Sequence, residues 1–315
     1  MEIDVIEDYA TLYDYAEELR RSNRGSTIEI KIERLAPRFP PLFQRFYTCF
    51  DDLRRDFLAG CRPILGLDEC YLKGIAKWEL LTAVARDANN QIFPLAWCVV
   101  EVKCTTSWTW FLEILKRDIG TPDGYRWTFI SDQQKVGKGP NGFRGKDEAR
   151  FCKAYFSYNT KCDSTYNNLA KAFNASIVQA RSKPVISMLN DIRLVVMEQI
   201  ISKRKAILGW KESCGPLIRA KLDKSIKEST EWNVHFNKDY GYEIMCGRIT
   251  YIVDLERMTC SHRLWDLSGI PCAHLVCVVY NKVEDLEKYL AKFYSKEMYM
   301  RTNEYDLQPI NGLDL

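Results

Sequence analysis

Leu80-Leu-Thr-Ala-Val-Ala-Arg-Asp87, Ala88-Asn-Asn-Gln91 and Ile92-Phe-Pro-Leu-Ala-Trp-Cys-Val-Val100 follow one another without a break, as two apolar runs joined by a polar turn signal. Asparagine favours turns because its short side chain hydrogen-bonds the local backbone and tolerates left-handed conformations. Apolar runs of this length between such signals are typical of strands. The stretch therefore predicts a hairpin of two β-strands.

The segments on either side of the hairpin extend this pattern. Before it, Arg62-Pro-Ile-Leu-Gly-Leu-Asp68 is a short apolar run that ends in an acid. After it, residues 107–119 have helical spacing, and Arg126-Trp-Thr-Phe-Ile-Ser-Asp132 is a further strand that again ends in an acid. Strand, hairpin, helix and strand in this order open the RNase H-like fold, in which the first and fourth strands lie side by side. We therefore predict an α/β fold with an RNase H-like core.

The composition is that of an ordinary globular protein. The chain has 315 residues, of which 46% are hydrophobic and 28% charged, and a net charge of +3. That charge is too small to indicate nucleic-acid binding by itself. No apolar run is long enough to predict a membrane span, and the acidic start lacks the features of a signal peptide. We therefore expect no membrane partner, and 12 cysteines that are reduced and mostly in the core.

The residues before the core predict a mixture of helix and strand. A helical pattern ends at the helix-stop Gly25, and Thr27–Glu33 alternates strictly and predicts a strand. Phe43–Phe57 is aromatic-rich and predicts a second helix.

The residues after the core are predicted to be mainly helical before a small C-terminal module. Residues 136–150 are glycine-rich and predict a loop, and helical patterns run from Asn167 to Glu228. Residues 242–254 predict a hairpin, and residues 272–280 a buried helix. The predicted organisation has five parts: an N-terminal helical and strand region (1–60), the core (61–175), a helical region (176–240), a zinc-binding module (241–285) and a tail (286–315).

The zinc-binding module is predicted from the motif Cys260-Ser-His262, nine further residues, then Cys272-Ala-His274, which contains two of the three histidines of the chain. Zinc prefers four thiolate or imidazole ligands in a tetrahedron, and each Cys-x-His pair can offer two of them. All four positions are filled by protein, which favours a structural zinc over a catalytic one. Cys246 and Cys277 flank the motif, but their spacing fits core packing better than metal binding.

Asp68 and Asp132 form a second candidate site because each closes a predicted strand. If those strands are neighbours, the two carboxylates meet at one edge of the sheet, where Mg²⁺ or Mn²⁺ would find the oxygen ligands that hard cations prefer. The alternative is that each aspartate only ends a strand and begins a turn. The pattern alone leaves both interpretations open.

Several longer stretches carry a resemblance to a known family. The chain resembles plant Mutator-like element (MULE) transposases, whose C-terminal zinc module is the SWIM finger. The likeness covers nearly the whole chain, with one gap, and is carried by Gly66-Leu-Asp-Glu-Cys-Tyr-Leu-Lys-Gly74, residues 81–97, Trp108-Thr-Trp-Phe-Leu112, Phe129-Ile-Ser-Asp-Gln-Gln-Lys135, Lys161-Cys-Asp163, Asn167-Asn168, Phe173-Asn174 and Trp265-Asp-Leu-Ser-Gly-Ile-Pro-Cys-Ala-His274.

The resemblance implies a DDE nuclease core on an RNase H-like fold, with Asp68 and Asp132 at the first two catalytic positions. It also implies a SWIM finger at residues 241–285, DNA as the partner and the nucleus as the compartment. Mg²⁺ or Mn²⁺ would be a cofactor only if the DDE site is active.

The chain departs from the family pattern in three places. Residues 136–150 join Asp132 almost directly to Phe151, as expected after an internal deletion that leaves the RNase H-like core incomplete. Lys171 stands where the family has its third acid, in the pattern Asn-Asn-x-x-Glu-x-x-Asn. His262 stands where the finger usually has cysteine, a replacement that zinc accepts. Because a lysine beside two divalent cations removes a ligand and adds repulsion, we expect a catalytically inactive, zinc-binding, transposase-derived protein.

Two other functions remain open from the sequence. One is an active DDE transposase that cuts and joins DNA with a substitute acid, for which Glu69, Glu148 and Asp163 are the local candidates. The other is a domesticated transcriptional regulator or interaction module. For the basic run Lys203-Arg204-Lys205, the first expectation is a solvated helix face, and the alternative is contact with DNA phosphates.

Overall fold

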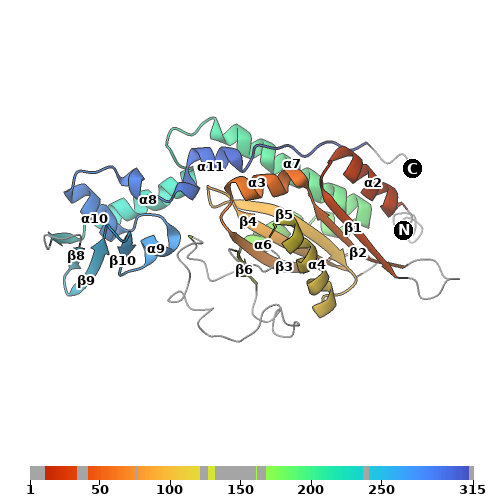
Figure 1. Cartoon of the computed structure of the whole chain (residues 1–315), viewed down its shortest axis with the longest axis horizontal. Helices are drawn as coiled ribbons and strands as arrows, with labels where there is room; N and C mark the ends of the chain where they lie inside the picture. The colour runs from red at the N-terminus through yellow and green to blue at the C-terminus, as the bar shows by residue number, and fades with distance from the viewer. Residues whose placement is uncertain are drawn as a thin grey trace.

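The computed structural model of the chain describes residues 11–33, 42–74, 77–120, 127–131, 161, 168–236 and 241–311. The molecule is elongated, with a larger sheet and its helices towards one end and a smaller sheet at the other (Figure 1). Among the helices of these residues, none combines the length and the apolar character that a membrane span requires.

The larger sheet has six strands in the order β1-β2-β5-β4-β3-β6. Every neighbouring pair is antiparallel except β3 and β6, which are parallel with Ile64 opposite Thr128 and Gly66 opposite Ile130. The predicted hairpin is confirmed as β4 and β5, and the first and fourth strands of the predicted core are neighbours, as expected. The strands are β1 (Thr27–Glu33), β2 (Leu42–Cys49), β3 (Ile64–Tyr71), β4 (Glu79–Arg86), β5 (Ile92–Val100) and β6 (Thr128–Ile130).

The segment Phe43–Phe57 differs from its prediction. Its first part is strand β2, and helix α3 (Asp51–Gly60) begins only after it, so the single predicted helix is wrong. β2 pairs with β1 on one edge and β5 on the other, and its side chains are covered on both faces: Phe46 packs against Tyr15 and Tyr47 against Phe111, so both are fully buried. Aromatic residues suit a half-buried strand as well as a helix face, and long-range pairing decides between the two.

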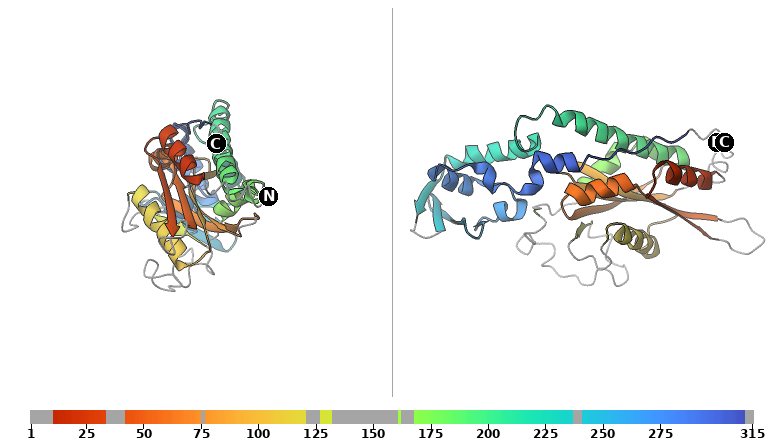
Figure 2. Two further views of the ribbon diagram at one scale, coloured as in Figure 1. Left: turned by 90° about the vertical axis from the view of Figure 1, so that its right-hand side faces the viewer. Right: turned by 45° about the horizontal axis from the view of Figure 1, so that its top comes forward.

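Helices cover both faces of the larger sheet. Helix α4 (Thr105–Asp118) lies on one face, whereas α6 (Asn168–Ser176) and α7 (Val185–Ile207) lie on the other (Figure 2). Helix α2 (Leu12–Ser22) contacts β1, and the chain reverses after it at Gly25, whose φ of +85° suits glycine. We call β1–β6 with α2, α3, α4, α6 and α7 the α/β domain.

The turn between β4 and β5 is bonded to two helices. The fully buried Asp87 accepts hydrogen bonds from the backbone of Asn89 and Gln91, and its other oxygen lies 2.8 Å from the ammonium of Lys203 on α7. Asn89 accepts a hydrogen bond from the backbone of Leu217 in α8 (Pro216–Ser229). The sequence identifies this segment as a turn, and the structure shows in addition that it anchors two helices.

The basic run Lys203-Arg204-Lys205 is not the solvated face expected from the sequence. Besides its ion pair, Lys203 donates to the carbonyl oxygen of Ile92. Arg204 bonds the carbonyl oxygen of Asn303 and the carboxylate of Asp306. Only Lys205 is exposed, because α7 lies between the sheet and the C-terminal residues. Two of the three cations therefore stabilise the fold.

The smaller sheet has four antiparallel strands in the order β10-β9-β8-β7. The predicted hairpin is confirmed as β8 and β9, and the predicted buried helix as α10. We call this sheet with α9 and α10 the C-terminal module. Its elements are β7 (Asn233–Phe236), β8 (Gly241–Cys246), β9 (Ile249–Asp254), β10 (Thr259–Cys260), α9 (Leu264–Ser268) and α10 (Ala273–Asn281).

The tail returns from the C-terminal module to the α/β domain. It contains two 3-10 turns, η5 (Leu286–Tyr289) and η6 (Lys292–Tyr294), and helix α11 (Lys296–Arg301); a further turn, η4 (Ala180–Ser182), precedes α7. Beyond α11, the backbone of Glu304 and Tyr305 donates to Asp56 on α3. Burial raises the pKa of Asp56 to about 7.

Candidate metal centre

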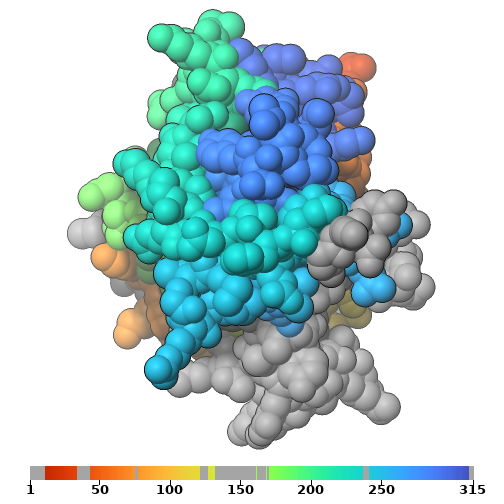
Figure 3. All heavy atoms as spheres, turned by 90° about the vertical axis from the view of Figure 1, so that its left-hand side faces the viewer, coloured from red at the N-terminus to blue at the C-terminus, as the bar shows by residue number. Residues whose placement is uncertain are grey.

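Short elements at one end of the C-terminal module bring Cys260, Cys272 and His274 together. Cys260 ends β10, Cys272 immediately precedes α10, and His274 lies in the first turn of that helix. The chain between them reverses at Gly269, whose φ is +72°. All three side chains are buried. Helix α8 and the strands of the module cover this end of the molecule (Figure 3).

The separations between the ligand atoms fit a tetrahedral metal. The Nδ1 atom of His274 lies 3.6 Å from the sulfur of Cys260 and 3.8 Å from the sulfur of Cys272, and the three ligand atoms all lie within 4.8 Å of one another. Metal–sulfur bonds of about 2.3 Å and metal–nitrogen bonds of about 2.0 Å place sulfur and nitrogen about 3.5 Å apart in a tetrahedron. The cluster can therefore hold a metal ion with little movement.

The two thiols are electrostatically unequal. The pKa of Cys272 lies well below that of an ordinary thiol, first because the Cys260 thiol donates to it and then because His262 and His274 are hydrogen-bonded to it. The pKa of Cys260 is raised because its own ionisation would break that bond to Cys272. Cys272 is thus the thiolate of the pair, the form in which cysteine binds metals.

Aromatic side chains fix the orientation of the His274 ring. The ring centroid lies 4.3 Å from that of Trp232, edge to face, and 4.2 Å from that of Tyr251. The buried Nε2 atom has no hydrogen-bond partner among the described residues. This packing directs Nδ1 towards the two thiols. No local motif marks Trp232 or Tyr251, although the predicted hairpin of residues 242–254 includes Tyr251.

His262 lies beside the cluster and is exposed. Its pKa is raised, first because it hydrogen-bonds the Cys272 side chain. Its ring centroid is 5.1 Å from that of His274, and the left-handed backbone of Arg263 after it closes a turn back to Cys260. The structure therefore brings three of the four predicted ligands into one cluster and places the fourth within reach of Cys272.

A buried aspartate is hydrogen-bonded to the backbone of one of the cluster residues. The carboxylate of Asp266 accepts a hydrogen bond of 2.9 Å from the backbone N–H of Cys260, which fixes the position of that residue. No pattern in the sequence predicts this role for Asp266, because its partner is a backbone N–H. Cys277 is not a ligand candidate in the structure, because its thiol donates to the carbonyl oxygen of Ser229, as its spacing predicted.

The first of the two predicted catalytic aspartates is buried at the C-terminal half of β3. Asp68 is 3% exposed, and its carboxylate accepts a hydrogen bond of 3.0 Å from the side-chain amide of Asn174 on α6. Asp132 lies outside the described residues. Gly66 of β3 is paired with Ile130 of β6, and Asp68 and Asp132 each come two residues later in the sequence.

The structure also shows where Lys171, at the predicted position of the third acid, and Glu69, a candidate substitute for that acid, lie. Lys171 is exposed on α6, three residues before Asn174 and so on the same side of the helix. Glu69 follows Asp68 in β3 and points to the opposite face of the sheet, where its carboxylate lies 3.1 Å from the ammonium of Lys103. Glu69 therefore cannot share a metal with Asp68. Glu148 and Asp163, the other candidates, lie outside the described residues.

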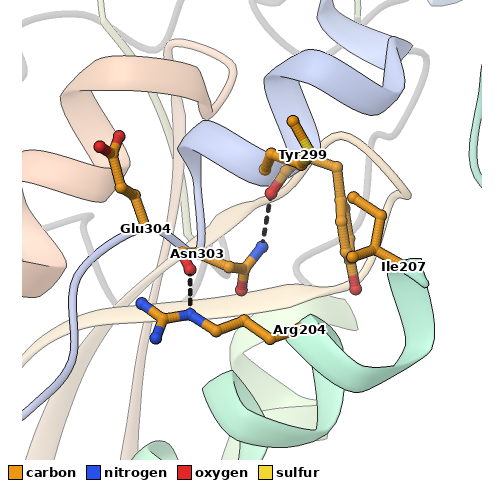
Figure 4. Close-up of a pocket in the computed structure, with 6 residues that line it drawn as sticks. Arg204, Ile207, Tyr299, Asn303 and Glu304 are labelled. Atoms are coloured by element: carbon orange, nitrogen blue, oxygen red, sulfur yellow. Dashed lines mark hydrogen bonds between the residues drawn. The ribbon is translucent and has the colours of Figure 1, made fainter.

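A small pocket of about 200 Å³ lies between α7 and α11. Figure 4 shows that Arg204, Asn303 and Tyr299 along its wall are joined by hydrogen bonds to one another rather than directed at a common point. The residues that line it include no histidine or cysteine and a single carboxylate, that of Glu304, so the pocket offers no catalytic constellation. It is separate from both the thiol cluster and Asp68.

Comparison of the chain with protein-family models, with curated proteins and with solved structures finds no match in any of the three.

Proposed function

We propose that this chain is a zinc-binding protein in which Cys260, His262, Cys272 and His274 hold one structural zinc ion. The observation that carries the proposal is the buried cluster of two sulfurs and one imidazole nitrogen at tetrahedral separations. Thiolate and imidazole together favour zinc over the hard cations. His262 supplies the fourth ligand by a small movement towards the metal, which replaces its hydrogen bond to Cys272.

We further propose that the α/β domain is an incomplete RNase H-like core inherited from a plant MULE transposase, and that the C-terminal module is a variant SWIM finger. The parallel pairing of β3 with β6 beside the β4–β5 hairpin supports the first part. The hydrogen bond from Asn174 to Asp68 supports it too, because it docks α6 beside the first predicted catalytic position.

The same contact supports the absence of transposase catalysis. It directs one side of α6 towards Asp68, and Lys171 lies on that side in the place of the third acid. A cation there repels the divalent metals that phosphodiester chemistry requires. DNA is the proposed partner and the nucleus the proposed compartment, both by resemblance. The two other candidate functions are a domesticated regulator and an active nuclease.

The zinc proposal is tested by metal analysis of the purified chain. We expect about one zinc per chain, the stoichiometry of a four-ligand site, and less than about a tenth of that for Cys272→Ser. Cys277→Ser is the matched control, because Cys277 is a neighbouring buried thiol outside the cluster. Equal zinc in the two variants, or none in the wild type, would refute the site.

The catalytic proposal is tested with DNA and either Mg²⁺ or Mn²⁺. We expect no metal-dependent cleavage by the wild type, and none by Asp68→Ala. Restoring the acid with Lys171→Glu provides a positive probe of the site, because it returns the family's third ligand to α6. Cleavage by the wild type that disappears in Asp68→Ala would overturn the inactive assignment.

A further inference from the structure

The start of β3 is held by a buried arginine. Arg62, two residues before the strand, is 2% exposed. Its guanidinium donates to the hydroxyl of Tyr294 at 3.1 Å and to the carbonyl oxygen of Lys161 at 2.8 Å, and it also donates to the side chain of Asn90 in the β4–β5 turn. A buried guanidinium needs such acceptors, because an unpaired one would be costly.

Tyr294 connects this arginine to the loop before Cys272. Its ring is buried, and its hydroxyl donates to the carbonyl oxygen of Ser268 at 2.5 Å. One residue later, Gly269 accepts a hydrogen bond of 2.8 Å from the backbone of Ala291. A Cβ atom at Gly269 would lie 2.6 Å from that of Ala291, so only glycine allows the approach.

Lys161 provides a second connection to the metal cluster. Its ammonium donates to the carbonyl oxygen of Asp266 at 3.1 Å. The carboxylate of the same aspartate holds the backbone N–H of Cys260. Arg62 is therefore linked to both thiol-bearing segments, to Cys272 through Tyr294 and to Cys260 through Lys161.

We propose that Arg62 is the positioning residue of a metal-dependent clamp that docks the C-terminal module on the α/β domain. The proposal rests on the zinc site proposed above. Metal binding fixes residues 266–269 between the two ligand pairs, and these residues present the carbonyl oxygens that hold Tyr294 and Lys161. Without metal, residues 266–269 are no longer held between the two ligand pairs, and Tyr294 and Lys161 are no longer aligned as acceptors for Arg62. The start of β3 and its pairing to β6 then become less stable.

The clamp is tested by amide hydrogen exchange of the full chain, loaded with zinc or stripped by a chelator. Zinc removal should accelerate exchange at residues 64–66 of the wild type, but not at residues 27–33 of β1, which lie far from the contact. Tyr294→Phe removes only the hydroxyl. Loss of one hydrogen bond increases the equilibrium constant for local opening about fivefold. The zinc-loaded variant should therefore already exchange about fivefold faster than the wild type at residues 64–66. Removing its zinc should then add little.

Tyr299→Phe is the matched control, because Tyr299 is equally buried but its hydroxyl bonds Gln91 and does not reach the module. This variant should keep the wild-type response to zinc at residues 64–66. Zinc removal that accelerates exchange only within residues 259–281 would overturn the clamp and leave the zinc site intact. A chain that binds no zinc at all refutes the proposed function itself, and the clamp with it.

Discussion

Lys203→Met should lower the free energy of unfolding by about 3–5 kcal/mol, because it leaves a buried carboxylate without its counter-ion. The side chain of Asp87 is fully buried, and that of Lys203 is 11% exposed. Methionine retains the volume of the lysine chain but cannot form the ion pair with Asp87 or donate to the carbonyl oxygen of Ile92. Chemical denaturation followed by circular dichroism measures the change.

Lys205→Met is the control for this prediction, since Lys205 lies two residues away on α7 and is exposed. It should change the free energy by less than about 0.5 kcal/mol. Asp87→Asn in the Lys203→Met background should recover part of the loss, because asparagine removes the charge and still accepts from Asn89 and Gln91. Similar costs for Lys203→Met and Lys205→Met would contradict the assignment.

Removal of the proposed zinc ion should unfold the C-terminal module locally. Structural zinc contributes on the order of 10 kcal/mol to small zinc-dependent folds, and here the ligands join β10 to α10. Trypsin cleavage after Arg263, which lies in the turn between the two ligand pairs, should accelerate more than about a hundredfold, equivalent to a loss of more than about 2.7 kcal/mol in local stability.

Cleavage after Arg117 provides the internal control. This residue is exposed on α4, on the far side of the larger sheet, and its rate should not respond to the chelator. Cys277→Ser should behave as the wild type with zinc present. A module that stays resistant at Arg263 after verified loss of zinc would show that its hydrophobic core is sufficient by itself.

The hairpin of the larger sheet and the thiol–imidazole cluster could both be predicted from local sequence, because each depends on residues close together in the chain. Two apolar runs on either side of Asn89-Asn90 form a hairpin through contacts between neighbouring segments, whichever other strands the sheet contains. Cys260 and Cys272 are only twelve residues apart, so a short loop can bring them together. The incorrect helix at Phe43–Phe57 arose because an aromatic-rich segment suits both helix and strand.

The alternation of elements and the residues of the thiol–imidazole cluster are encoded in short stretches of the sequence. What holds the two parts of the molecule together depends on contacts that form only when distant segments pack. Lys203 is a structural cation because α7 lies over the β4–β5 turn, and Glu69 is excluded as a partner of Asp68 because adjacent strand residues face opposite ways. Arg62 and Tyr294 are 232 residues apart in the chain, and no local pattern encodes a contact whose partners meet only after folding.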